Sequence, residues 1–265
     1  MICPRDSFGR GEQIDMTVIE YGKEKPDVIM LLHGGGLSWW NYRKEAEILE
    51  RYFHVLLPVL DGHAGSDDEF ESIEKNAERI LAYIDREYGG SLLMMGGLSL
   101  GGQILTEILS RRGDICRYAL IESAAMIPDK VTSALIGPSF SSSYGLIRQK
   151  WFASLQFSYL KIREDLFDDY YRDSAALTKE NLIAFTRASV SYSPKETLKE
   201  TTAEVLIAAG GKEQKSVLRS AELLHRMLKG SRLEIKEGLY HGQFSINCPE
   251  QYAAEVMKLT GKDCL

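Results

Sequence analysis

The sequence predicts an α/β fold in which a mostly parallel central sheet carries helices on both faces. Three observations favour this fold class. Apolar runs of strand length alternate along the chain with amphipathic runs of helical spacing. The most apolar runs show no polar alternation, as expected of strands that are buried on both faces. Glycine-rich and polar turns follow these runs, at the carboxyl ends of the strands where such sheets bind ligands.

The apolar runs predict seven strands. In chain order, these strands are expected near residues 16–21, 27–32, 54–60, 91–96, 118–121, 205–209 and 233–235. The second strand runs into His33-Gly34-Gly35-Gly36, and the third runs into Asp61-Gly62. Both turns are therefore expected at the ligand-binding edge of the sheet.

Amphipathic stretches between the strands predict the helices. A helix over about residues 68–88 places six apolar side chains on one face: Phe70, Ile73, Ala77, Ile80, Leu81 and Ile84. A second helix follows the fourth strand, with apolar residues at helical spacing: Ile104, Leu105, Ile108 and Leu109. Residues 216–228 form a third predicted helix. Pro249 opens the last helix and Gly261 closes it, in keeping with the preference for proline at a helix start and glycine after its end.

A long segment, residues 128–194, breaks this alternation because it contains no clear buried strand. It looks helical and is rich in large side chains: Trp151, Phe152, Phe157, Tyr159, Leu160, Phe167, Tyr170, Tyr171 and Phe185. We expect a helical lid inserted between two strands of a core made of residues 1–127 and 195–265. An ordinary helical subdomain, whose aromatic residues form their own core, is the alternative, and the two are compatible.

Composition excludes several classes of function. The net charge of −6 argues against a nucleic-acid surface, which needs a basic stripe. No metal site or disulfide framework is expected, because the cysteines at positions 3, 116, 248 and 264 form no C-x-x-C pair. Residues 1–6 lack the apolar core of a signal peptide, and no apolar run is long enough to span a membrane. We therefore expect a cytoplasmic protein with no membrane partner. Nothing in the sequence indicates an oligomeric state.

The motif Gly97-Leu98-Ser99-Leu100-Gly101 lies between the fourth strand and the helix that follows it. A G-x-S-x-G in this position is typical of a sharp turn that presents a serine hydroxyl at the end of the sheet. A serine hydroxyl is a weak nucleophile unless a base takes its proton and a third group orients that base. Ser99 is therefore the predicted nucleophile of a serine hydrolase.

The predicted base is His241, because triads of this type follow the chain order serine, acid, histidine. It lies in a loop between the last strand and the last helix. The remaining histidines lie in turns, at a strand start or inside a helix: His33, His63, His54 and His225. For the acid we favour Glu213, in the loop after strand 205–209, and keep Glu122, after strand 118–121, as the alternative.

An oxyanion needs backbone N–H donors as well. The amide of Leu100, next to the nucleophile, is one expected donor. The second is expected from the glycine turn at residues 33–36, through Gly35 or else Gly36. Trp39 and Trp40 follow this turn, where they either line a substrate entrance or anchor a helix to the core.

Four segments together resemble the α/β-hydrolase fold enzymes, in particular the lid-bearing esterases, lipases and C–C hydrolases. They are residues 33–36, residues 58–66, residues 97–102, and His241-Gly242 with Cys248-Pro249-Glu250 downstream. The second segment resembles a turn that is structural in such enzymes, so Asp61 and His63 are not expected to take part in catalysis. Relatives usually carry aspartate where this chain has Glu213.

The resemblance implies acyl transfer with no cofactor. Ser99 would attack the carbonyl of a small acyl substrate, and water would release the acyl group from Ser99. The expected activity is hydrolysis of a carboxylic ester, including thioesters and lactones. Hydrolysis of a C–C or amide bond by the same residues is one alternative. A non-catalytic ligand-binding protein is the other, although a scaffold would more readily have lost part of the triad.

Overall fold

Seven strands form one sheet in the order β1-β3-β2-β4-β5-β6-β7. The computed structural model describes residues 16–262, apart from the side chains of residues 142 and 143, so Cys3, Cys264 and the first six residues lie outside the described part. The strands are β1 (Val18–Tyr21), β2 (Val28–Leu32), β3 (His54–Pro58), β4 (Leu92–Leu98), β5 (Cys116–Glu122), β6 (Glu204–Gly210) and β7 (Arg232–Lys236). All seven occur where the apolar runs predict them.

Strands β2 to β7 pair in parallel, and only β1, which pairs with β3, is antiparallel among the described strands. The central strands are buried along nearly their whole length. Parallel strands need helical crossovers that cover both faces of the sheet, which explains why these runs lack polar alternation. The predicted fold class is confirmed.

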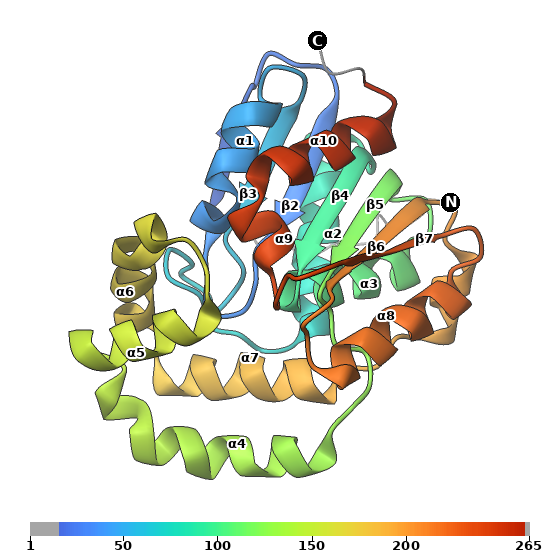
Figure 1. Cartoon of the computed structure of the whole chain (residues 1–265). Helices are drawn as coiled ribbons and strands as arrows, with labels where there is room; N and C mark the ends of the chain where they lie inside the picture. The colour runs from blue at the N-terminus through green and yellow to red at the C-terminus, as the bar shows by residue number, and fades with distance from the viewer. Residues whose placement is uncertain (1–15, 263–265) are drawn as a thin grey trace, which may run out of the picture.

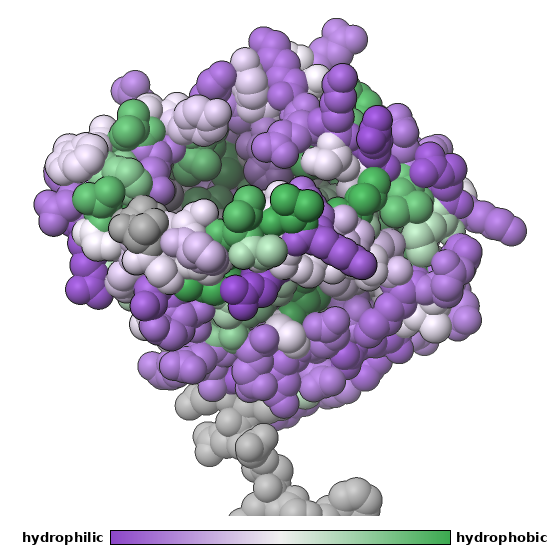
Figure 2. All heavy atoms as spheres, turned by 90° about the horizontal axis from the view of Figure 1, so that it is seen from below, coloured by the Kyte–Doolittle hydropathy of each residue, from purple (hydrophilic) through white to green (hydrophobic). Residues whose placement is uncertain are grey.

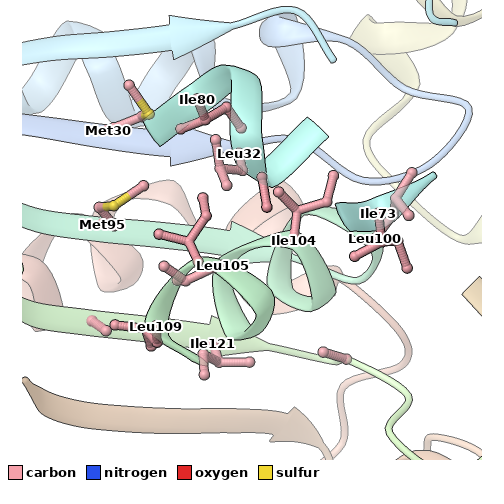
Figure 3. Packing of buried hydrophobic residues seen from close by; sticks show 14 of the residues in the cluster. Met30, Leu32, Ile73, Ile80, Met95, Leu100, Ile104, Leu105, Leu109 and Ile121 are labelled. Carbon is pink, nitrogen blue, oxygen red and sulfur yellow. The ribbon is translucent and has the colours of Figure 1, made fainter. Parts of the chain in front are cut away.

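Helices cover both faces of the sheet (Figure 1). One face packs against α2 (Ile73–Tyr88), α3 (Leu100–Arg111) and α8 (Lys215–Met227). The other face packs against α1 (Arg43–Leu49), α9 (Gln243–Asn247) and α10 (Pro249–Thr260). Figure 3 shows the first layer, in which Ile104 and Leu105 of α3 lie against Met95 and Leu32 of the sheet.

Helix α2 begins five residues later than expected, because Ser72 caps it. The Ser72 hydroxyl accepts a hydrogen bond from the Lys75 amide at 3.0 Å, which satisfies one of the free N–H groups at the helix start. The short helices α1 and α9 were not predicted from the sequence. Helices of this length give too few turns for a periodic apolar pattern.

The interval between β5 and β6 is helical. It contains α4 (Lys130–Ser143), α5 (Lys150–Leu160), α6 (Phe167–Ala176) and α7 (Lys179–Ser191). Figure 1 shows α4 and α7 below the carboxyl ends of the strands, with α5 and α6 beside them. This placement brings the helices over the edge of the sheet where the predicted site residues lie.

Trp40 connects this helical segment to the core. Its side chain is fully buried, and its indole N–H donates a hydrogen bond to the Asp173 carboxylate of α6 at 2.6 Å. Arg172 also pairs with Asp173, at 2.7 Å. A second contact between the two parts joins Arg43 to Asp169 at 2.9 Å. Trp40 therefore occupies the anchoring position that the sequence left as one of two alternatives.

We predict that Trp40→Phe lowers the free energy of unfolding by about 1–3 kcal/mol, because the buried Asp173 carboxylate loses a donor. The comparison variant is Trp39→Phe, since Trp39 is only half-buried on the same 3-10 turn, η1 (Trp39–Tyr42). Urea unfolding of both variants measures the difference. Equal losses would show that the hydrogen bond to Asp173 contributes nothing.

Candidate active site

The turn from β4 into α3 places Ser99 in a strained backbone conformation. Ser99 has φ 53° and ψ −110°, a region that costs a residue with a side chain about 1–3 kcal/mol. A Cβ at Gly97 would collide with the carbonyl oxygen of Gly101, and one at Gly101 would collide with that of Leu32. Both flanking positions of the motif therefore admit only glycine.

Ser99, His241 and Glu213 form a continuous hydrogen-bonded chain. The Ser99 hydroxyl lies 3.0 Å from His241 Nε2, and His241 Nδ1 lies 2.8 Å from Glu213 Oε2. The predicted nucleophile, base and favoured acid thus meet at the carboxyl ends of β4, β6 and β7. This is the geometry in which a histidine can take a serine proton while a carboxylate holds the ring.

The Glu213 side chain is fully buried behind His241, where three donors hold it. Besides His241, the Gly210 amide donates to Glu213 Oε1 at 2.9 Å and the Ser123 hydroxyl donates to the same oxygen at 2.5 Å. Burial alone would raise the pKa of Glu213, but the hydrogen bonds and the charge of His241 hold the pKa below its ordinary value. The hydrogen bond back to the Gly210 amide helps to hold the glutamate side chain in place beside His241.

Ser123 is a site residue that the sequence analysis missed. Its hydroxyl also accepts a hydrogen bond from the Gly242 amide at 3.3 Å, so it links the Glu213 loop to the His241 loop. Ser123 has φ 54°, an unusual value for a residue other than glycine. Its position directly after a predicted strand, at the same edge as Ser99, was the only sequence signal.

Glu122, the alternative acid, lies elsewhere in the hydrogen-bond network. Its carboxylate accepts from the Ser245 amide in α9 at 3.1 Å, and its backbone carbonyl accepts from the Ser99 amide at 2.8 Å. Burial, reinforced by the nearby charge of Glu213, raises the pKa of Glu122 to about 7. Glu122 thus contacts the backbone on both sides of the site, while the hydrogen bond to His241 comes from Glu213.

Two backbone amides at the site have no hydrogen-bond acceptor among residues 16–262: those of Gly35 and Leu100. Leu100 is the first residue of α3, and the first amides of a helix have no partner within it. A Cβ at Gly35 would lie 3.5 Å from the Leu100 Cβ, so the two segments are in contact. Both amides are therefore free to bind an oxyanion.

The neighbouring amides of the glycine turn are already occupied. Gly34 N–H donates to the Asn41 side chain at 3.2 Å, and Gly36 N–H donates to His63 Nε2 at 3.1 Å. Gly36, named as the other possible donor, is therefore not available in this structure. Burial lowers the pKa of His63 to about 4, which keeps its ring neutral and able to accept this bond.

A cavity of about 290 Å³ opens beside Ser99 and His241. The helical segment supplies much of its wall, including Phe140, Leu160, Tyr170, Leu177 and Phe185. No Asp, Glu, Lys or Arg of the described chain lines it, and neither do Trp39 and Trp40. The two tryptophans thus do not line the binding cavity, because the turn η1 directs Trp40 into the core.

On the face seen in Figure 2, hydrophobic residues come to the surface among polar ones and surround a recess. The exposed hydrophobic residues of α4 and α5 include Val131, Leu135, Trp151, Leu155 and Tyr159. Within residues 16–262 no helix is both long and apolar enough to cross a bilayer, and His, Cys, Asp and Glu form no group of three suited to hold a metal ion.

Residues 29–255 match the family described as the Alpha/beta hydrolase family, so the chain belongs to that family. The pimeloyl-(acyl-carrier protein) methyl ester esterase of Neisseria meningitidis serogroup C (serotype 2a) is 27% identical over 252 residues, covering 88% of this chain and 94% of the relative. The serogroup A protein of the same description is also 27% identical, over 251 residues, and covers 88% of this chain and 77% of that relative.

Solved structures share the fold at low sequence identity. An esterase from Exiguobacterium antarcticum has a TM-score of 0.79 at 17% identity, covering 93% of this chain and 96% of that one. The enol-lactonase from Burkholderia xenovorans has a TM-score of 0.78 at 14% identity, with the same coverage. The chain is thus an α/β hydrolase, and esterases are among the proteins that it resembles.

Because the pKa of Glu122 is raised, we expect the free energy of unfolding to depend on pH. The native state retains the Glu122 proton to about pH 7, whereas an unfolded glutamate loses it near its ordinary pKa of about 4.3. The native state thus binds more protons between these values, and this contribution to stability is lost as pH rises through 7. As the pH rises from 5 to 8, the free energy of unfolding of Glu122→Gln should therefore increase by about 2–3 kcal/mol relative to that of the wild type.

Urea unfolding of wild type and Glu122→Gln at several pH values measures this difference. Glu222→Gln serves as the control, because Glu222 is exposed on α8. A Glu122→Gln difference that does not change with pH would mean that Glu122 is ionised in the native state well below pH 7.

Proposed function

We propose that this protein is a serine hydrolase that cleaves a small carboxylic ester through an acyl-enzyme on Ser99. The observation that carries the proposal is the hydrogen-bonded chain from Ser99 through His241 to the buried Glu213. The free amides of Gly35 and Leu100 beside Ser99 support it. Esterase and lactonase folds among the structural neighbours are consistent with the same chemistry.

In the first half of the reaction, Ser99 Oγ attacks the ester carbonyl carbon while His241 Nε2 takes the hydroxyl proton. Glu213 accepts the Nδ1 proton of His241 in a hydrogen bond, which fixes the ring and stabilises its positive charge. The carbonyl oxygen becomes an oxyanion that accepts hydrogen bonds from the Gly35 and Leu100 amides. His241 then passes its proton to the alcohol oxygen, the C–O bond breaks and the alcohol leaves.

The second half repeats these steps with water. A water molecule gives a proton to His241 Nε2 and attacks the acyl carbon on Ser99. The same two amides hold the second oxyanion. The bond to Ser99 Oγ breaks, His241 returns the proton to Ser99, and the carboxylic acid leaves. Every proton in the two halves passes to or from His241 Nε2, so the proposed reaction calls on no cofactor.

Glu213 takes the role of triad acid in this proposal, and Glu122 does not. The hydrogen bond to His241 Nδ1 at 2.8 Å supports Glu213, whereas the carboxylate of Glu122 contacts the Ser245 amide. The hydrogen bonds and the charge of His241 hold the pKa of Glu213 below its ordinary value, which favours an ionised carboxylate beside the ring. The raised pKa of Glu122 disfavours a charge at that position.

The helical segment, residues 128–194, acts as a lid on the core of residues 1–127 and 195–265. Its residues form much of the cavity beside Ser99, which supports a role in selecting the substrate. The uncharged wall favours a neutral substrate, because a charged group would lose its hydration there without a partner. The curated relatives are named for hydrolysis of a methyl ester, which agrees with an ester as substrate.

A fluorophosphonate probe should label the wild-type protein and fail to label Ser99→Ala, because phosphonylation requires the activated hydroxyl. In-gel fluorescence of the two proteins measures this. Ser110→Ala is the matched control, since Ser110 lies in α3, the helix that follows Ser99, and its hydroxyl donates to the Thr106 carbonyl. Labelling that persists in Ser99→Ala would assign the nucleophile to another residue.

We expect Glu213→Gln to lower kcat for p-nitrophenyl acetate by about 10³–10⁴-fold, because the amide cannot support a positively charged His241. Glu122→Gln should stay within about tenfold of the wild type. Steady-state kinetics on both variants provides the comparison. The reverse ranking would make Glu122 the acid.

A further inference from the structure

Ser99 lies between two cavities. The larger one, about 290 Å³, is lined by His241 and by much of the helical segment. A smaller one, about 160 Å³, is lined by Leu100 and by α7 residues that include Ser189 and Val190. Gly35, Ser99, Phe185 and Thr186 line both cavities, whereas His241 lines only the larger.

The wall between the two cavities is held in place by packing. Phe185 is buried and stacks on the His63 ring, with ring centroids 4.6 Å apart. The side-chain amide of Gln103 in α3 donates to the Ser189 carbonyl of α7 at 2.7 Å. The smaller cavity is therefore bounded by α3 on one side and by α7 on the other.

The four substituents of the tetrahedral intermediate must occupy different parts of the site. Its carbon carries Ser99 Oγ, the oxyanion, the alcohol oxygen and the acyl chain. The oxyanion belongs at the Gly35 and Leu100 amides, and the alcohol oxygen must reach His241 Nε2 to receive its proton. Since His241 lines only the larger cavity, the alcohol part points into that cavity. The acyl chain is left with the smaller one.

We infer that the enzyme selects esters with a short acyl chain and a longer, apolar alcohol, with the acyl chain in the smaller cavity under α7. This inference rests on the proposed function and specifies its substrate class. The volume of the smaller cavity, about 160 Å³ against about 290 Å³ for the larger, favours a short acyl chain. Thr186 and Ser189 line it, and polar residues of this kind are compatible with a short chain, which exposes little apolar surface.

Two isomeric esters, which have the same composition, test which side of the ester bond must carry the short chain. Hexyl acetate has the short chain on the acyl side, and methyl heptanoate has it on the alcohol side. We expect kcat/KM for hexyl acetate to be at least about tenfold higher, after each rate is divided by the rate of hydrolysis by hydroxide. Equal values, or a preference for methyl heptanoate, would overturn the inference while leaving the proposed function intact.

Failure of the proposed function has a different signature. The wild type would hydrolyse neither isomer, or Ser99→Ala would hydrolyse both at the wild-type rate. In either case the serine mechanism would fall, and the inference with it.

Paired truncations test which cavity holds which chain. Val190 lines only the smaller cavity and Leu160 only the larger, so Val190→Ala and Leu160→Ala are matched variants. With p-nitrophenyl acetate, butyrate and octanoate, Val190→Ala should raise the octanoate-to-acetate ratio of kcat/KM several-fold. Leu160→Ala should leave that ratio near the wild-type value and instead alter the preference among acetates of methanol, butanol and octanol. The opposite pattern would place the acyl chain in the larger cavity.

Discussion

The close approach of α3 to β2 and β4 is the contact on which the rest of the site depends. At Gly101 the helix backbone lies against the Leu32 carbonyl, and at Gly97 the strand lies against the helix start, so neither position has room for a Cβ. This approach accompanies the strained conformation of Ser99 and brings the start of α3 against the Gly35 turn. The positions of the proposed nucleophile and of the proposed oxyanion donors thus depend on the same close packing of α3 against the sheet. The stability of the surrounding core, shown in Figure 3, offsets the strain.

A second set of contacts fixes the base and its acid. The end of β5 supplies both residues that do this: the Ser123 hydroxyl binds the Glu213 carboxylate and the Gly242 amide, and the Glu122 carboxylate binds the start of α9. The loops that carry Glu213 and His241 come from different strands and have no regular structure of their own. Their relative position depends on these side chains, which explains why buried polar groups lie so close to the site.

The strands and longer helices could be predicted from the sequence because apolar runs and amphipathic spacing are local signals. Ser99, His241, Glu213 and Gly35 could be proposed because their chain order and turn positions follow a known pattern. The role of Ser123 could not be read in this way, since it depends on the distance between two loops that are far apart in the sequence. The same reason applies to Trp40, whose partner Asp173 lies 133 residues downstream, and to Gly36, whose amide is taken by His63. Such contacts follow from the packing of the folded chain, which no periodicity encodes.

In the mechanism that we propose, the reaction passes through an acyl group bound to Ser99. A direct test is to let the protein turn over p-nitrophenyl acetate, quench the reaction in acid and map the peptides by mass spectrometry. The acid quench stops release of the acyl group from the enzyme, because deacylation requires general base catalysis. We expect one acetyl group on the peptide that contains Ser99, and none on that peptide of Ser99→Ala. Turnover that proceeds with no acetylated peptide, or an acetyl group on another side chain that forms and decays at the rate of turnover, would contradict it.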